Sequence, residues 1–292
     1  MIDHSKVHRA ARVLSGGGPE VSPAKARALV TDLRAQAKRA PGIVASVTGL
    51  AEAAEHAAAV EVKVVDRATW ASAGAVSIEN MIPGRDVVGT LEGAVVFSAV
   101  AAKVLGQFDP FSEPERLYLV APNVAAFRMN FDLDRRDLCL WVAVHELTHA
   151  TQFAAAPWLK PELAKRAGQL MDAFNSNAGV EEALANVTAV MSLLEGHAEY
   201  VMNNVPTTRI PSRQRIVSAM AAQRAGSNPI VAFLVRKLGL DKKTAQYAAG
   251  ETFVKYVVRE RGMEFFNKVW LAPEHLPTPA ELADPAAWIE RM

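Results

Sequence analysis

The chain has 292 residues, of which half are hydrophobic and 22% are charged, so extended disorder is excluded and a substantial core can form. Its 32 basic and 31 acidic residues leave a formal net charge of +1, which argues against a nucleic-acid-binding protein. We expect a single domain over residues 1–292, with no nucleic-acid partner.

Neither the N-terminal residues nor the apolar stretches of the chain indicate a membrane or secreted protein. Residues 1–6 lack the apolar core and cleavage signal of a secretory peptide. The most apolar stretch, 87–104, is interrupted by Glu92 and Lys103, so it is shorter than the roughly 20 uncharged residues that span a bilayer. The lone Cys139 excludes an internal disulfide and is typical of a reducing compartment. The sequence therefore predicts a cytoplasmic protein without a membrane partner.

Helical patterns dominate the first half of the chain. Ser22 and Pro23 predict the N-cap and first turn of a helix. Alternating valines predict a strand that begins at Val60. In chain order we expect helices at 23–38 and 41–59, a strand at 60–65, a short helix within 66–84, a largely buried helix at 86–106 and a second strand at 116–120.

The second half is predicted to be helical almost throughout. Asp134, followed three residues later by Asp137, predicts the start of a helix that ends before Pro157. Further helices are expected at 161–174 and 180–203, a loop at 206–213, and a mostly helical remainder with a proline-rich tail. The predicted fold class is mainly α with a small amount of β-strand.

Residues 145–149, HELTH, lie within this predicted helix and contain the candidate metal ligands and the candidate catalytic base. His145 and His149 are four residues apart, so they lie on one helical face and can bind a single Zn²⁺ at about 2.0–2.1 Å. Glu146 can then remove a proton from water as a general base. This pattern predicts one zinc ion per chain and the chemistry of a zinc peptidase.

A catalytic zinc site generally has three protein ligands and one open position. A metzincin-type third histidine is excluded, because the residues after His149 break that pattern. Glu195, His197 and Glu199 are the candidates on the later predicted helix. Glu195 is our first choice, since Gly196 beside it permits close approach between helices. Glu199 would then accept the free N–H of a ligand histidine.

The tetrahedral intermediate of amide hydrolysis also needs a donor for its oxyanion. Candidates from the sequence are Arg128, Tyr200, Tyr247 and His275, and the sequence distinguishes none of them. The predicted strand at 116–120 offers an edge to which an extended peptide could pair.

Three segments of the chain resemble a known family: HELTHATQF, MSLLEGHAEYVM and the tail that ends in ADPAAWIERM. Together they resemble an actinobacterial-type zincin-like family, whose members are labelled zinc-dependent metalloproteases or hydrolases associated with deazaflavin-coenzyme biosynthesis. The resemblance implies a mostly helical zincin-like domain, with His145 and His149 as ligands and Glu146 as the base. Distant zinc peptidases with a later EG-containing helix use that glutamate as a ligand, which by analogy favours Glu195.

These observations predict a zinc-dependent hydrolase, first of all a gluzincin-like metallopeptidase acting on peptides. One alternative is a zinc-bearing scaffold, or pseudopeptidase, that acts through protein contacts. Another keeps the hydrolysis but replaces the peptide with a small amide or a γ-glutamyl conjugate.

Overall fold

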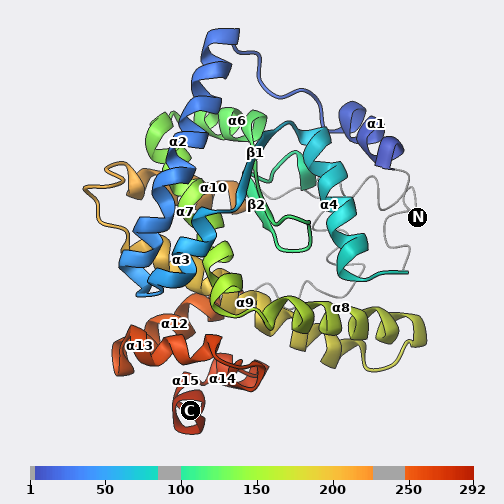
Figure 1. Cartoon of the computed structure of the whole chain (residues 1–292), viewed down its shortest axis with the longest axis vertical. Helices are drawn as coiled ribbons and strands as arrows, with labels where there is room; N and C mark the ends of the chain where they lie inside the picture. The colour runs from blue at the N-terminus through green and yellow to red at the C-terminus, as the bar shows by residue number, and fades with distance from the viewer. Residues whose placement is uncertain (1–3, 85–99, 226–246) are drawn as a thin grey trace.

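The computed structural model describes residues 4–84, 100–225 and 247–292 (Figure 1). The first elements are α1 (His4–Leu14), α2 (Pro23–Thr48), α3 (Ala51–Ala58), β1 (Glu61–Val65), α4 (Arg67–Met81), β2 (Gly106–Asp109), β3 (Arg116–Val120) and α6 (Ala121–Phe131). The remaining helices are α7 (Arg135–Ala155), α8 (Leu159–Ser176), α9 (Val180–Asn204), α10 (Arg213–Ala225), α12 (Tyr247–Arg261), α13 (Met263–Phe266), η2 (Asn267–Trp270), η3 (Pro273–His275), α14 (Pro279–Ala283) and α15 (Pro285–Arg291). These residues form a mainly helical structure with one small sheet, as predicted.

The motif helix α7 lies at the centre of the structure. It begins as predicted, because the Asp134 carboxylate accepts a hydrogen bond from the backbone N–H of Asp137. The carboxylate of Asp137 in turn accepts hydrogen bonds from Ser212, which joins the start of α7 to the loop before α10. Packing against α2, α3, α9 and β2 buries α7 on most sides. Apolar residues occur on most faces of α7, as is usual for a helix that other elements enclose.

The three strands form a sheet in the order β1-β3-β2, with β3 parallel to β1 and antiparallel to β2. Side chains alternate along β3 between two apolar clusters. Leu117 and Leu119 pack in the core formed with α2 and α7, whereas Tyr118 and Val120 pack in the core formed with α1 and α4. Because β3 is paired on both sides, the prediction that 116–120 offers an edge to a peptide is wrong.

A second layer is built from α8, α9, α12 and the C-terminal segment. In Figure 1, α8 runs beside α9, and the red helices α12 to α15 gather at one end. Their core contains the large buried side chains Phe253, Phe266, Trp270 and Trp288. This layer holds α9 in place against α7.

The predicted break between helices near Pro41 is wrong. A proline inside a helix removes one backbone hydrogen bond and costs roughly 3 kcal/mol. Here α2 continues through Pro41, because apolar side chains on both halves, including Leu33 and Val44, are buried in the same core. The helix ends instead at Gly49, which has the left-handed conformation (φ 73°) that favours glycine.

Other expectations met mixed outcomes. The strand near 60–65 and the helices near 66–84, 161–174 and 180–203 are confirmed as β1, α4, α8 and α9. The predicted helix at 86–106 lies mostly outside the described residues, and Gly106 begins strand β2 rather than ending a helix. Helices α1 and α6 were not predicted.

No helix in the described ranges is long and apolar enough to cross a membrane. That residues 1–292 form one domain stays a prediction.

Helices α9 and α12 approach each other through two glycines. A Cβ atom added to Gly196 would lie 2.1 Å from the carbonyl carbon of Gly250, and one added to Gly250 would lie 1.8 Å from the carbonyl oxygen of Ser192. Real Cβ atoms do not tolerate such distances to backbone, so glycine is required on both helices. The expectation that Gly196 permits close helix packing is confirmed.

Substituting Gly250→Ala should therefore push α12 away from α9 and lower the free energy of unfolding by about 1–3 kcal/mol, the usual cost of overpacking. Urea denaturation followed by circular dichroism measures this change. Gly42→Ala is the matched control, because a Cβ at this exposed position in α2 meets nothing within 4 Å. That control should raise stability by roughly 0.5–1 kcal/mol. Equal stability of Gly250→Ala and wild type would contradict the close contact.

Candidate metal centre

Two helices bring three potential metal ligands to one point. His145 and His149 project from α7, and Glu195 projects from α9. The Nε2 atoms of the two histidines are 3.3 Å apart. The Glu195 carboxylate lies 3.5 Å from each histidine, with Oε2 facing His145 Nε2 and Oε1 facing His149 Nε2. These ligand atoms come from residues far apart in the sequence, so the crossing of α7 and α9 creates the cluster.

The spacing of these atoms fits a tetrahedral ion. Bonds of about 2.0–2.1 Å place the ligand atoms of tetrahedral zinc about 3.3–3.4 Å apart. The two Nε2 atoms match this edge length at 3.3 Å, and each faces a different oxygen of the Glu195 carboxylate at 3.5 Å. One ligand atom from each of the three residues lies within 4.8 Å of the other two. Two imidazoles and one carboxylate are also a donor set suited to zinc. A zinc ion therefore fits the residues that are present.

The other two candidates for the third ligand lie elsewhere. His197 is fully buried, does not belong to the cluster and packs beside the rings of Phe266 and Trp270 at centroid distances of 5.2 and 5.3 Å. The pKa of His197 is lowered to about 3, chiefly because of burial and also because of His149, so the ring is neutral. Glu199 lies one turn from Glu195 and faces a cavity.

The expected contact between Glu199 and the free N–H of a ligand histidine is not made at His149. The Nδ1 atom of His149 lies 2.9 Å from Oε1 of Gln152 instead. Gln152 is on the same helix, three residues after His149, so the two side chains share a face. That spacing is the signal in the sequence that could have identified Gln152.

Glu146 lies beside the cluster and is held by strand β2. The backbone N–H of Phe108 donates a hydrogen bond of 3.0 Å to Oε2 of Glu146. The side chain is only 7% exposed. The pKa of Glu146 is raised to about 7, chiefly because of burial; Glu195 acts in the same direction, whereas His149 and the Phe108 N–H oppose it. A buried carboxyl group of this kind is suited to accept and return a proton.

Gly106 makes room for Glu146. A Cβ atom at Gly106 would lie 2.7 Å from Cγ and 3.1 Å from Oε1 of Glu146. The sequence analysis missed both Gly106 and Phe108, because it did not predict β2. Gly106 was placed at the end of a predicted helix, and no local pattern in the sequence indicated its close approach to Glu146.

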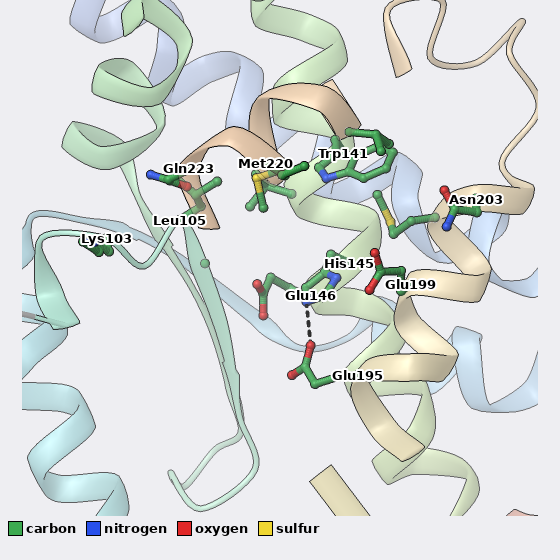
Figure 2. Close-up of a pocket in the computed structure, with 15 residues that line it drawn as sticks. Lys103, Leu105, Trp141, His145, Glu146, Glu195, Glu199, Asn203, Met220 and Gln223 are labelled. Carbon is green, nitrogen blue, oxygen red and sulfur yellow. Dashed lines mark ion pairs between the residues drawn. The ribbon is translucent and has the colours of Figure 1, made fainter. Parts of the chain in front are cut away.

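A cavity of about 290 Å³ opens directly onto this cluster (Figure 2). In Figure 2, His145, Glu146, Glu195 and Glu199 face a common space from α7 and α9. The rest of the cavity lining is mainly apolar and includes the polar side chains of Lys103, Asn203 and Gln223. The cavity is lined by Lys103, Leu105, Gly106, Trp141, Val142, His145, Glu146, Glu195, Glu199, Met202, Asn203, Val217, Met220, Ala221 and Gln223.

Three of the four predicted oxyanion donors do not line this cavity. Arg128, Tyr200 and His275 do not line it, and the side chain of Tyr247 lies outside the described residues. His275 contacts the carbonyl oxygen of Lys268 through Nδ1. Donor side chains that do line the cavity include Lys103, Trp141, Asn203 and Gln223, which belong to no recognisable motif.

Comparison with known proteins agrees with this geometry. The zincin-like metallopeptidase family matches residues 2–92, 83–187 and 173–289, so the chain belongs to this family. The chain is also similar to a solved structure from Chloroflexus aurantiacus described as a "putative hydrolase with a novel fold". The two share 29% sequence identity and a TM-score of 0.75, over 100% of this chain and 99% of that one. No curated protein matches the chain.

Substituting Gly106→Ala should displace Glu146 while leaving the metal ligands in place. A displacement of about 1 Å in a reacting group can reduce turnover about 100-fold. We expect a loss of this order in kcat for any substrate that the wild type hydrolyses, with unchanged zinc content by elemental analysis. Gly168→Ala serves as the control, since a Cβ there meets nothing within 4 Å. Full activity of Gly106→Ala would show that Glu146 tolerates displacement.

Proposed function

We propose that this zincin-like metallopeptidase is a zinc-dependent hydrolase that holds one Zn²⁺ with His145, His149 and Glu195. The observation that carries the proposal is the cluster of one ligand atom from each of these residues, all within 4.8 Å of one another, with Glu146 adjacent. This arrangement combines the motif of one helix with a glutamate from another, as in gluzincins. Family membership supports the same reaction class.

When bound, zinc supplies Lewis-acid chemistry, because it acidifies water and polarises a carbonyl group. Glu146 would act as the general base, accepting the proton of the attacking water at Oε1 and returning it to the leaving amine. The Phe108 N–H holds Oε2 and thereby orients the carboxylate. The buried position of Glu146 excludes bulk water from competing for this proton.

A peptide is the first substrate class to consider, because strand β2 offers a backbone edge at the site. The carbonyl oxygen of Leu105 accepts a hydrogen bond from Val120 of β3, whereas the N–H of Phe108 faces Glu146. Alternation along the strand places the backbone groups of Gly106 on the same outer side as those of Phe108. A peptide main chain could pair with Gly106, with one apolar side chain in the pocket formed by Trp141, Met202 and Met220.

A small amide or γ-glutamyl conjugate is the second candidate. The cavity volume of about 290 Å³ favours it, since ligand pockets commonly span about 300–1,000 Å³. A library that contains both short peptides and small amides separates the two substrates. Selective turnover of small amides would replace the peptide in the proposal without changing the chemistry.

Removal of single ligands tests the metal site. We expect close to one zinc per chain in the wild type, and strong loss of zinc in His145→Ala and Glu195→Ala, because two remaining ligands bind zinc weakly. Elemental analysis after dialysis measures the content. Glu181→Ala is the control, because it removes an exposed carboxylate at the far end of α9. A wild type that takes up no zinc when supplied with it would refute the proposal.

Replacing the base separates binding from catalysis. Glu146→Gln should keep its zinc and lose activity by about 100-fold or more, since it retains the side-chain shape but cannot accept the proton. Zinc content and kcat are measured on the same preparation. Equal turnover by Glu146→Gln and wild type would exclude Glu146 as the base.

A further inference from the structure

The side chain of Gln152 bridges the two helices that supply the ligands. It is completely buried. Its Oε1 lies 2.9 Å from Nδ1 of His149. Its Nε2 lies 2.9 Å from the carbonyl oxygen of Leu194 and 3.0 Å from Nδ1 of His197. One amide thus contacts a ligand on α7, the peptide group that immediately precedes the ligand Glu195, and a buried imidazole on α9.

These contacts allow only one orientation of the amide. The Leu194 carbonyl can accept a hydrogen bond but cannot donate one. The atom of Gln152 that faces it must therefore be the NH₂ group, because the opposite orientation would place two oxygens against each other in a buried site. The carbonyl oxygen of Gln152 is then the atom that faces His149.

The orientation of the amide determines which nitrogen of His149 carries the proton. A carbonyl oxygen only accepts, so Nδ1 of His149 must be the N–H that donates to Gln152. Nε2 of His149 then carries the lone pair, and it is the atom that faces Glu195 Oε1 at 3.5 Å. His149 is thus held in the tautomer that can bind a metal at Nε2.

His197 also contacts the Gln152 amide, but it accepts a hydrogen bond, whereas His149 donates one. The second N–H of the Gln152 amide donates to Nδ1 of His197, so the proton of this neutral ring is on Nε2. That Nε2 is buried and has no hydrogen-bond partner in the described structure. An unpaired buried N–H destabilises the folded state. An apolar ring in the same stacked position would avoid this unpaired N–H. The imidazole, however, provides an acceptor for the second N–H of Gln152.

We propose that Gln152 is a positioning residue for the metal centre: it holds His149 in the Nδ1–H tautomer and anchors it to the backbone beside Glu195. This inference rests on the proposed zinc site, because its consequence is a preformed set of ligands. His197 supports Gln152 from α9 and does not bind the metal. Partners of this kind commonly change metal affinity by about 10–100-fold.

The first test compares zinc affinity in variants by competition with a chelator of known affinity. Gln152→Met has a similar length and no amide, and it should bind zinc about 10–100-fold more weakly than wild type. Thr151→Val is the matched control, because Thr151 is also completely buried on α7 and its hydroxyl donates only to the Leu147 carbonyl within the same helix. The control should keep wild-type affinity. Equal affinity of Gln152→Met and wild type, or an equal loss in Thr151→Val, would overturn the proposal.

The second test uses the wild type without zinc, so its result does not depend on whether a variant folds. Nitrogen-15 NMR of the imidazole rings in metal-free wild type distinguishes the two tautomers, and the chain has only seven histidines to assign. We expect Nδ1–H for His149 and Nε2–H for His197. Nε2–H at His149 would overturn the inference. A wild type that shows the expected tautomers but no zinc uptake would refute the metal centre alone, so the two failures are distinguishable.

Discussion

The position of α9 relative to α7 is the constraint on which the site depends, because the two histidines and the glutamate come from different helices. Two contacts fix this position. On one side of α9, the Gln152 amide of α7 binds the carbonyl oxygen of Leu194. On the other side, Gly196 lies against Gly250 of α12 so closely that no side chain fits between them. Glu195 is located between these two contacts, and a shift of either one would change its distance to the histidines.

The proposed general base depends on a different neighbour. Glu146 points toward β2, where glycine at 106 leaves space for it and the N–H of Phe108 binds its carboxylate. Strand β2 is itself held by pairing with β3, whose alternate side chains are buried on both faces of the sheet. The proposed third ligand on α9 and the carboxylate of the proposed base are therefore positioned by separate contacts, so a change at β2 should move Glu146 without moving Glu195.

Much of the mechanism was readable in local patterns. The spacing of His145 and His149 depends only on helical periodicity, and the start of their helix depends only on the carboxylate of Asp134, so both predictions are confirmed. The choice of Glu195 before His197 and Glu199 agrees with the structure, in which Glu195 lies 3.5 Å from both histidines. Local patterns failed at Pro41, where shared burial of both halves of α2 outweighs the local cost of proline.

The sequence by itself determined the mainly helical fold class, the metal-binding face of α7 and the identity of the candidate base, because each depends on residues within a few turns of one another. Tertiary structure alone decided which nitrogen of His149 faces Glu195, the burial of His197 and the contact of Glu146 with β2. Each of these depends on groups that are distant in the chain, such as Gln152 with Leu194 and Phe108 with Glu146. Sequence periodicity describes neighbours along one element, whereas these contacts exist only once the elements have packed together.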